Sequence, residues 1–129
     1  MSKNSALRLS LPFAAALLLS APLANAHAGH KPLHGGILDF YQETSVEMVA
    51  KPSGIEIYVQ YDDENISSQG LSGTVKVTAP GAKAKTYKLT PAGGNRLDAK
   101  GVKAPKGSIV EVTLTGVEDT PAVTAYTVQ

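Results

Sequence analysis

The three histidines of this chain, His27, His30 and His34, all lie within one eight-residue segment of sequence HAGHKPLH. Imidazole nitrogen is the commonest neutral metal ligand in proteins, and it suits both copper and zinc. Chance seldom gathers every histidine of a chain into so short a segment. We therefore expect these side chains to bind a metal ion, with Cu(II) as the first candidate and Zn²⁺ as the second.

The segment before the histidines has the features of a secretory signal peptide. Lys3 and Arg8 form a basic start, an apolar stretch follows over residues 9–19, and Ala24-Asn25-Ala26 fits the small-x-small cleavage pattern. The apolar stretch is shorter than the roughly 20 residues that span a bilayer. We expect residues 1–26 to be removed, which predicts a periplasmic protein without a stable membrane anchor.

The cleavage point decides which ligands the mature terminus offers. Cleavage after Ala26 would make His27 the first residue. The α-amine of His27, with a pKa of about 8, could then chelate an ion together with the His27 ring. Cleavage after Ala28 is the alternative, and it would leave Gly29-His30-Lys31, whose amine, amide and imidazole suit Cu(II). Both termini favour copper.

Composition argues against several classes of function. The chain has no cysteine, which excludes disulfides, thiol redox chemistry and thiolate metal sites. Its 12 basic and 11 acidic side chains nearly cancel, so the composition does not supply the basic face that nucleic acid requires. The chain also lacks a Gly-x-Ser-x-Gly elbow, a phosphate-binding loop and any histidine outside the cluster, so we do not expect an enzyme.

Apolar and polar residues alternate in short segments after the histidines, as in half-buried β-strands. The clearest segment is 55–61, in which Ile55, Ile57, Val59 and Tyr61 should face the core. Similar alternation surrounds residues 38–40, 46–48, 75–77, 87–89 and 110–114, and the segments 51–54 and 91–95 are rich in the glycine and proline of tight turns.

These patterns predict one all-β domain. Residues 36–129 should form a single immunoglobulin-like antiparallel β-sandwich of seven or eight strands, with a small barrel as the alternative. Residues 27–35 should form a flexible arm that carries the histidines.

Two acidic features of the sequence are candidate metal ligands, the residue Glu47 and the segment 62–65. Glu47 should point to the face opposite Val46 and Met48, and it could supply a carboxylate ligand if the arm folds back over its strand. Met48 itself should belong to the core. The acidic segment Asp62-Asp63-Glu64-Asn65 fits no calcium-loop spacing, so we expect a solvated loop there.

Three short motifs carry a resemblance to a known group of proteins: His34-Gly35-Gly36, Val46-Glu47-Met48-Val49 and the segment 90–97 of sequence TPAGGNRL. With these motifs, the chain from His34 onward resembles small proteobacterial periplasmic β-sandwich proteins associated with heavy-metal efflux, and the metal-facing domains of periplasmic efflux adaptor subunits. The resemblance implies a sandwich fold and a role in metal handling. Relatives often carry a histidine two residues before the glutamate, where this chain has Ser45.

The leading hypothesis is therefore a periplasmic protein that binds copper or zinc and buffers the ion or delivers it to an efflux system. Its expected partners are the metal ion and an efflux adaptor or related export component. The competing hypothesis is a β-sandwich protein-interaction module in which the histidines have no metal role.

Overall fold

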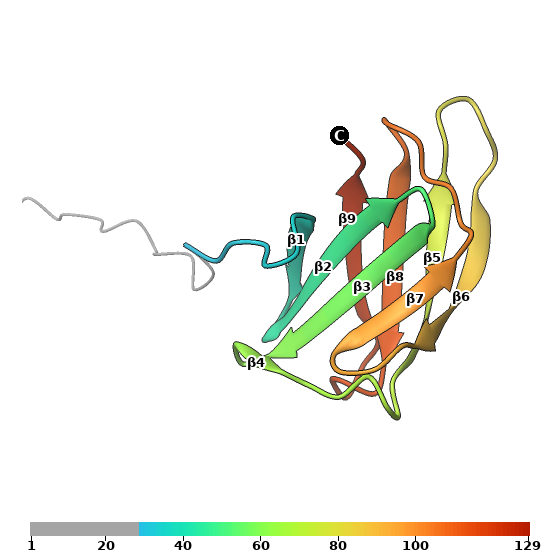
Figure 1. The fold of residues 1–129 in the computed structure, drawn as a ribbon. Helices are drawn as coiled ribbons and strands as arrows, with labels where there is room; N and C mark the ends of the chain where they lie inside the picture. Colours follow the sequence, from blue (N-terminus) through green and yellow to red (C-terminus); the bar gives the residue numbers. More distant parts are fainter. Residues whose placement is uncertain (1–28) are drawn as a thin grey trace, which may run out of the picture.

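The computed structural model describes residues 29–129, and this part of the chain is all-β with no helix (Figure 1). It therefore contains no helix that could span a membrane. Residues 1–28, which include His27 and the expected signal peptide, lie outside the described residues. The described chain forms nine strands: β1 (Ile37–Tyr41), β2 (Thr44–Lys51), β3 (Gly54–Tyr61), β4 (Glu64–Asn65), β5 (Ser72–Thr78), β6 (Lys85–Pro91), β7 (Arg96–Lys100), β8 (Ile109–Thr115) and β9 (Ala122–Thr127).

All strand pairs are antiparallel, and the strand order is β1-β2-β3-β7-β6-β5-β8-β9, with β4 paired to β3. Strand β6 connects the two halves of this sheet. Its residues 85–89 pair with β5, whereas only Thr90 and Pro91 pair with β7. The sheet thus bends at β6 and brings its two outermost strands together.

Side chains rather than a strand ladder join the two outermost strands, β1 and β9. The Asp39 carboxylate accepts a hydrogen bond from the Ala125 amide of β9 at 3.0 Å, and the Tyr41 hydroxyl lies 2.8 Å from the hydroxyl of Thr120 in the loop before β9. The Tyr126 hydroxyl donates to the Val46 carbonyl oxygen of the adjacent strand at 2.8 Å. The nine-stranded sheet is therefore nearly closed.

The alternation predicted for 55–61 places Ile55, Ile57 and Val59 in the core, where each is at most 1% exposed. Met48 is also buried, as predicted. The prediction for Tyr61 is wrong, because its side chain is 41% exposed. Tyr61 is the last residue of β3 and lies beside the two-residue strand β4, past the end of the buried cluster.

The predicted turns at 51–54 and 91–95 do reverse the chain, between β2 and β3 and between β6 and β7. The predicted count of seven or eight strands is too low, because residues 62–65 form more than a loop. Asp62 and Asp63 adopt positive φ angles of 48° and 63°, which turn the chain back at once, so that Glu64 and Asn65 pair with β3.

The buried hydroxyl of Tyr126 gives a test of the seam between the two outermost strands. Burial raises the pKa of Tyr126 far above its usual value, and the hydroxyl bonds to both Val46 and Thr124. Tyr126→Phe keeps the ring but leaves the buried Val46 carbonyl without this donor. The free energy of unfolding should therefore fall by about 1–2 kcal/mol. Denaturant titration measures this change. The exposed control Tyr61→Phe should change the free energy of unfolding by less than about 0.5 kcal/mol. Equal changes in the two variants would show that the Tyr126 hydroxyl does not stabilise the contact between β9 and β2.

Candidate metal site

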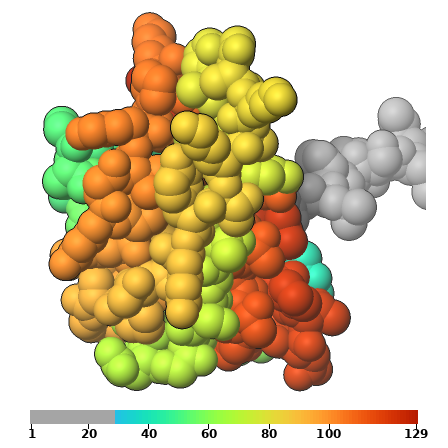
Figure 2. Space-filling model, turned by 90° about the vertical axis from the view of Figure 1, so that its right-hand side faces the viewer, coloured from blue at the N-terminus to red at the C-terminus, as the bar shows by residue number. Residues whose placement is uncertain are grey.

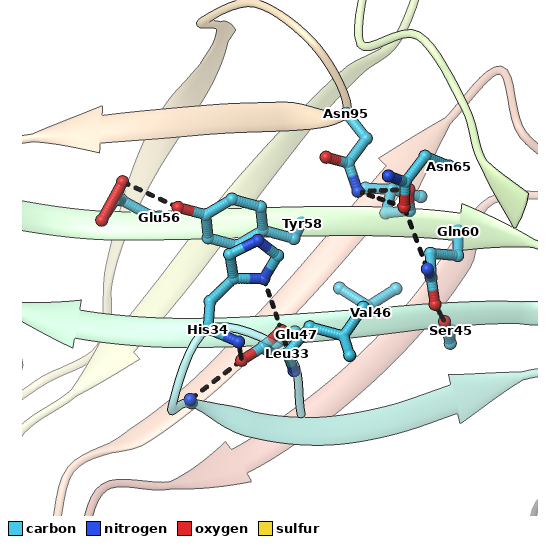
Figure 3. Close-up of polar contacts among 12 residues, drawn as sticks. Leu33, His34, Ser45, Val46, Glu47, Glu56, Tyr58, Gln60, Asn65 and Asn95 are labelled. Atoms are coloured by element: carbon cyan, nitrogen blue, oxygen red, sulfur yellow. Dashed lines mark hydrogen bonds and ion pairs between the residues drawn. The ribbon is translucent and has the colours of Figure 1, made fainter. Parts of the chain in front are cut away.

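Glu47 holds the histidine arm against the sheet. It lies in the middle of β2 on the face opposite Val46, as the alternation predicts, yet its residue is only 3% exposed because the arm covers it. One carboxylate oxygen, Oε1, accepts hydrogen bonds from the amides of His34 at 2.8 Å and Gly36 at 2.9 Å. The other, Oε2, accepts from the Leu33 amide at 3.0 Å and from Nδ1 of His34 at 2.8 Å (Figure 3).

These four donors stabilise the charged form of Glu47. Burial alone raises the pKa of its carboxyl, but the hydrogen bonds from the His34 ring and from the three arm amides outweigh burial and lower the pKa below its ordinary value. A carboxylate has about four lone-pair positions. The arm therefore occupies the acceptor capacity of Glu47.

The His34 ring is fixed by two contacts. A carboxylate has no proton to give, so the contact with Glu47 places the proton of the neutral ring on Nδ1 and leaves a lone pair on Nε2. The ring also stacks on Tyr58 of β3, with ring centroids 3.5 Å apart and an angle of 7° between the planes (Figure 3). The His34 side chain is 37% exposed, so a ligand can reach it from solvent.

Tyr58 is in turn held by charged neighbours on the same face. Its hydroxyl donates to Oε2 of Glu56 at 3.2 Å. Glu56 forms ion pairs with Lys51 and with Arg96, the latter at 3.3 Å. The pairing with Lys51 is the main reason that the pKa of Glu56 is lowered. The surface on which His34 rests is therefore fixed by contacts from strands β2, β3 and β7.

A small cavity of about 10 Å³, with a mixed polar and apolar lining, opens beneath the arm next to His34. This volume is about that of one water molecule or one ion. Its lining includes Ser45 and Gln60, whose side chains are joined by a 3.3 Å hydrogen bond. Ser45 thus lies at the same cavity as His34 and Glu47.

His30 contacts a different carboxylate. Its Nδ1 lies 3.5 Å from Oδ1 of Asp63, and its ring packs against Phe40 with centroids 5.5 Å apart. Asp63 belongs to the turn between β3 and β4, for which the sequence predicted only a solvated loop without a role. No signal in the sequence could have paired Asp63 with His30, because the path of the arm depends on its tertiary contacts.

The structure brings His34 and Glu47 together and places His30 at a neighbouring carboxylate. Within residues 29–129, no three histidine, aspartate or glutamate side chains converge as a complete metal-binding group. His27, the third predicted ligand, lies outside the described residues. Sequence reasoning missed Tyr58, whose place in an alternating strand marked it only as a residue of the outer face.

Comparison with known proteins adds no assignment: no protein family, curated protein or solved structure matches this chain.

Proposed function

We propose that this chain binds Cu(II), or alternatively Zn²⁺, through the imidazoles of its histidine arm. The observation that supports this proposal best is the contact between Glu47 and His34. Histidines that bind metals almost always donate the other ring N–H to a carboxylate, a carbonyl or water, which fixes the ring and increases its basicity. His34 has this arrangement, with Nε2 left to bind the ion.

The proposal assigns different roles to the residues of the site. His34 is a ligand through Nε2, and Glu47 is a positioning residue, because its oxygens already accept four hydrogen bonds. His30 is a second ligand, with Asp63 next to its Nδ1. His27, with its α-amine after cleavage, completes a shell of nitrogen ligands that suits Cu(II).

The same proposal includes the cellular setting. The chain is exported to the periplasm, where it buffers the ion or delivers it to an efflux adaptor, and its nine strands form a sandwich of immunoglobulin-like type. The signal-like residues 1–26 support export, and the resemblance of the short motifs to those of efflux-associated proteins is the ground for the efflux setting. A site on an arm at the surface suits transfer, because its ligands can exchange without opening the core.

Calorimetric titration with Cu(II) and Zn²⁺ tests the proposal on protein purified from the periplasm, with its amino terminus determined by intact mass. We expect one ion to bind more tightly than micromolar, and His34→Ala to weaken binding more than about 100-fold, since even loss of a supporting residue costs 10- to 100-fold. Lys31→Ala, in the same arm, should leave the affinity unchanged. No binding by the processed chain, or equal affinity of His34→Ala, would contradict the proposal and favour the interaction module.

A further inference from the structure

Opposite ends of the sheet carry opposite charge. Because antiparallel strands reverse at each connection, alternate connections meet at the same end. At the upper end in Figure 1, the β2–β3 turn meets the β7–β8 loop through a 2.8 Å hydrogen bond from the Gly101 amide to the Ser53 carbonyl. At the lower end, the β1–β2 and β3–β4 turns meet through a 3.0 Å hydrogen bond from the Asp62 amide to the Glu43 carbonyl.

The upper end, which we call the lysine end, gathers six exposed lysines. Figure 2 shows the β5–β6 and β7–β8 loops next to one another at the top of the molecule. The connections at this end and the strand residues that border them contain no aspartate or glutamate. The six lysines of the lysine end are Lys51, Lys83, Lys85, Lys100, Lys103 and Lys106.

The lower end, which we call the acid end, has the reverse composition. Its connections contain no lysine or arginine, and Arg96, the first residue of β7, is the basic strand residue that borders them. The six acidic residues there are Glu43, Asp62, Asp63, Glu64, Glu118 and Asp119. The nearly balanced composition of the chain therefore conceals a strong separation of charge between its two ends.

Most of the positive charge of the lysine end is not neutralised within the described chain. Lys51 forms an ion pair with Glu56. The other five lysines have no carboxylate within ion-pair distance among residues 29–129. Lys103 donates only to a neutral acceptor, the Pro52 carbonyl oxygen. An extended negative surface can therefore approach this end without displacing internal ion pairs.

We propose that the lysine end docks on the surface of a bilayer that contains anionic phospholipid. Each lysine near such a surface strengthens binding about fivefold at ordinary salt, so the five lysines of this end that form no ion pair are sufficient for reversible attachment. The connections of this end contain mostly glycine, alanine and proline between the lysines, which lets the ammonium groups reach a flat surface together. They carry no aromatic side chain to stack nucleic-acid bases, so a lipid surface fits better than a single strand of nucleic acid.

Docking in this way would orient the histidine arm. His30 contacts Asp63 of the acid end, so attachment through the lysine end turns the acid end and this part of the arm away from the bilayer. The field of the acid end attracts cations toward the arm. The docking proposal itself does not depend on metal binding.

Vesicle sedimentation with the full mature chain tests the docking. We expect binding at low salt to vesicles of phosphatidylcholine with phosphatidylglycerol, much weaker binding at about 0.5 M salt as charges are screened, and none to phosphatidylcholine alone. The triple variant Lys83→Gln, Lys85→Gln, Lys106→Gln should bind about 100-fold more weakly. The matched triple variant Lys31→Gln, Lys76→Gln, Lys88→Gln removes the same charge outside the lysine end and should lose less than about fivefold.

Three outcomes would overturn the docking proposal. No binding to the anionic vesicles at low salt would exclude a lipid surface, and equal losses in both triple variants would show that only net charge matters. Sedimentation velocity supplies the third. Head-to-tail association of the chain at low salt, without vesicle binding, would identify the acid end of a second copy as the partner of the lysine end.

Discussion

Glu47→Gln should weaken metal binding by about 10- to 100-fold and release the arm from the sheet. Glutamine keeps one carbonyl oxygen, whereas the native carboxylate accepts four hydrogen bonds from Leu33, His34 and Gly36. The new amide group would direct its own N–H groups at the N–H groups of the arm. Since Glu47 is 3% exposed, water cannot satisfy these groups without opening the structure.

Amide hydrogen exchange separates the two consequences of Glu47→Gln. Without any metal, the amides of Leu33, His34 and Gly36 should lose protection, because each donates to Glu47 in the native chain. The metal titration then reports affinity independently. Glu111→Gln is a matched control, since Glu111 lies on β8 and pairs only with Lys76 at the surface. Full protection of the three amides in Glu47→Gln would show that the carboxylate does not hold the arm.

Much of the strand pattern could be predicted because successive side chains of a strand point to opposite faces of the sheet, and only one face is buried. Wherever apolar residues alternate, as at Ile55, Ile57 and Val59, the sequence alone indicates which side of the strand faces the core. The tight turns were also predictable, since their glycine and proline residues satisfy local backbone requirements. Strand β4 was not, because it depends on the positive φ angles of Asp62 and Asp63, which side-chain patterns do not reveal.

The candidate site was predictable in its residue types but not in its contacts. The sequence indicated that Glu47 would face the arm if the arm folded back, and the structure has this arrangement. It could not indicate that three arm amides would share the carboxylate, because backbone donors are the same in every sequence. The stacking of His34 on Tyr58 and the contact of His30 with Asp63 likewise join residues far apart in the chain.

The charge separation between the lysine end and the acid end could not be predicted from the total composition for a related reason. Seven of the eight charged residues between positions 39 and 64 are acidic, and eight of the nine between positions 76 and 106 are basic, so the two groups cancel in the total charge. Antiparallel pairing then sorts these groups by the direction of each strand, which collects Lys51 with Lys103 and Glu43 with Asp62. Topology, rather than composition, creates the lysine end and the acid end.

Gly36→Ala should have the second large effect on the arm, because there is no room for a side chain at this position. A Cβ on residue 36 would lie 2.4 Å from the Met48 carbonyl oxygen and 2.8 Å from a methyl carbon of Val49. Strand β2 cannot yield easily, since it is paired with β1 on one side and with β3 on the other. The arm must then move outward, and the Gly36 amide loses its hydrogen bond to Glu47.

We expect Gly36→Ala to lower the free energy of unfolding by about 1–3 kcal/mol, as overpacking does, and to weaken metal binding at least about tenfold. Gly35→Asn is the matched control. Gly35 has a φ of 75°, but a Cβ there would have no neighbouring atom within 4 Å, and asparagine tolerates this backbone conformation better than most residues. Denaturant titration and calorimetry of both variants give the comparison. Equal behaviour of the two would mean that close approach of Gly36 to β2 does not anchor the arm, and that His34 reaches its position by other contacts.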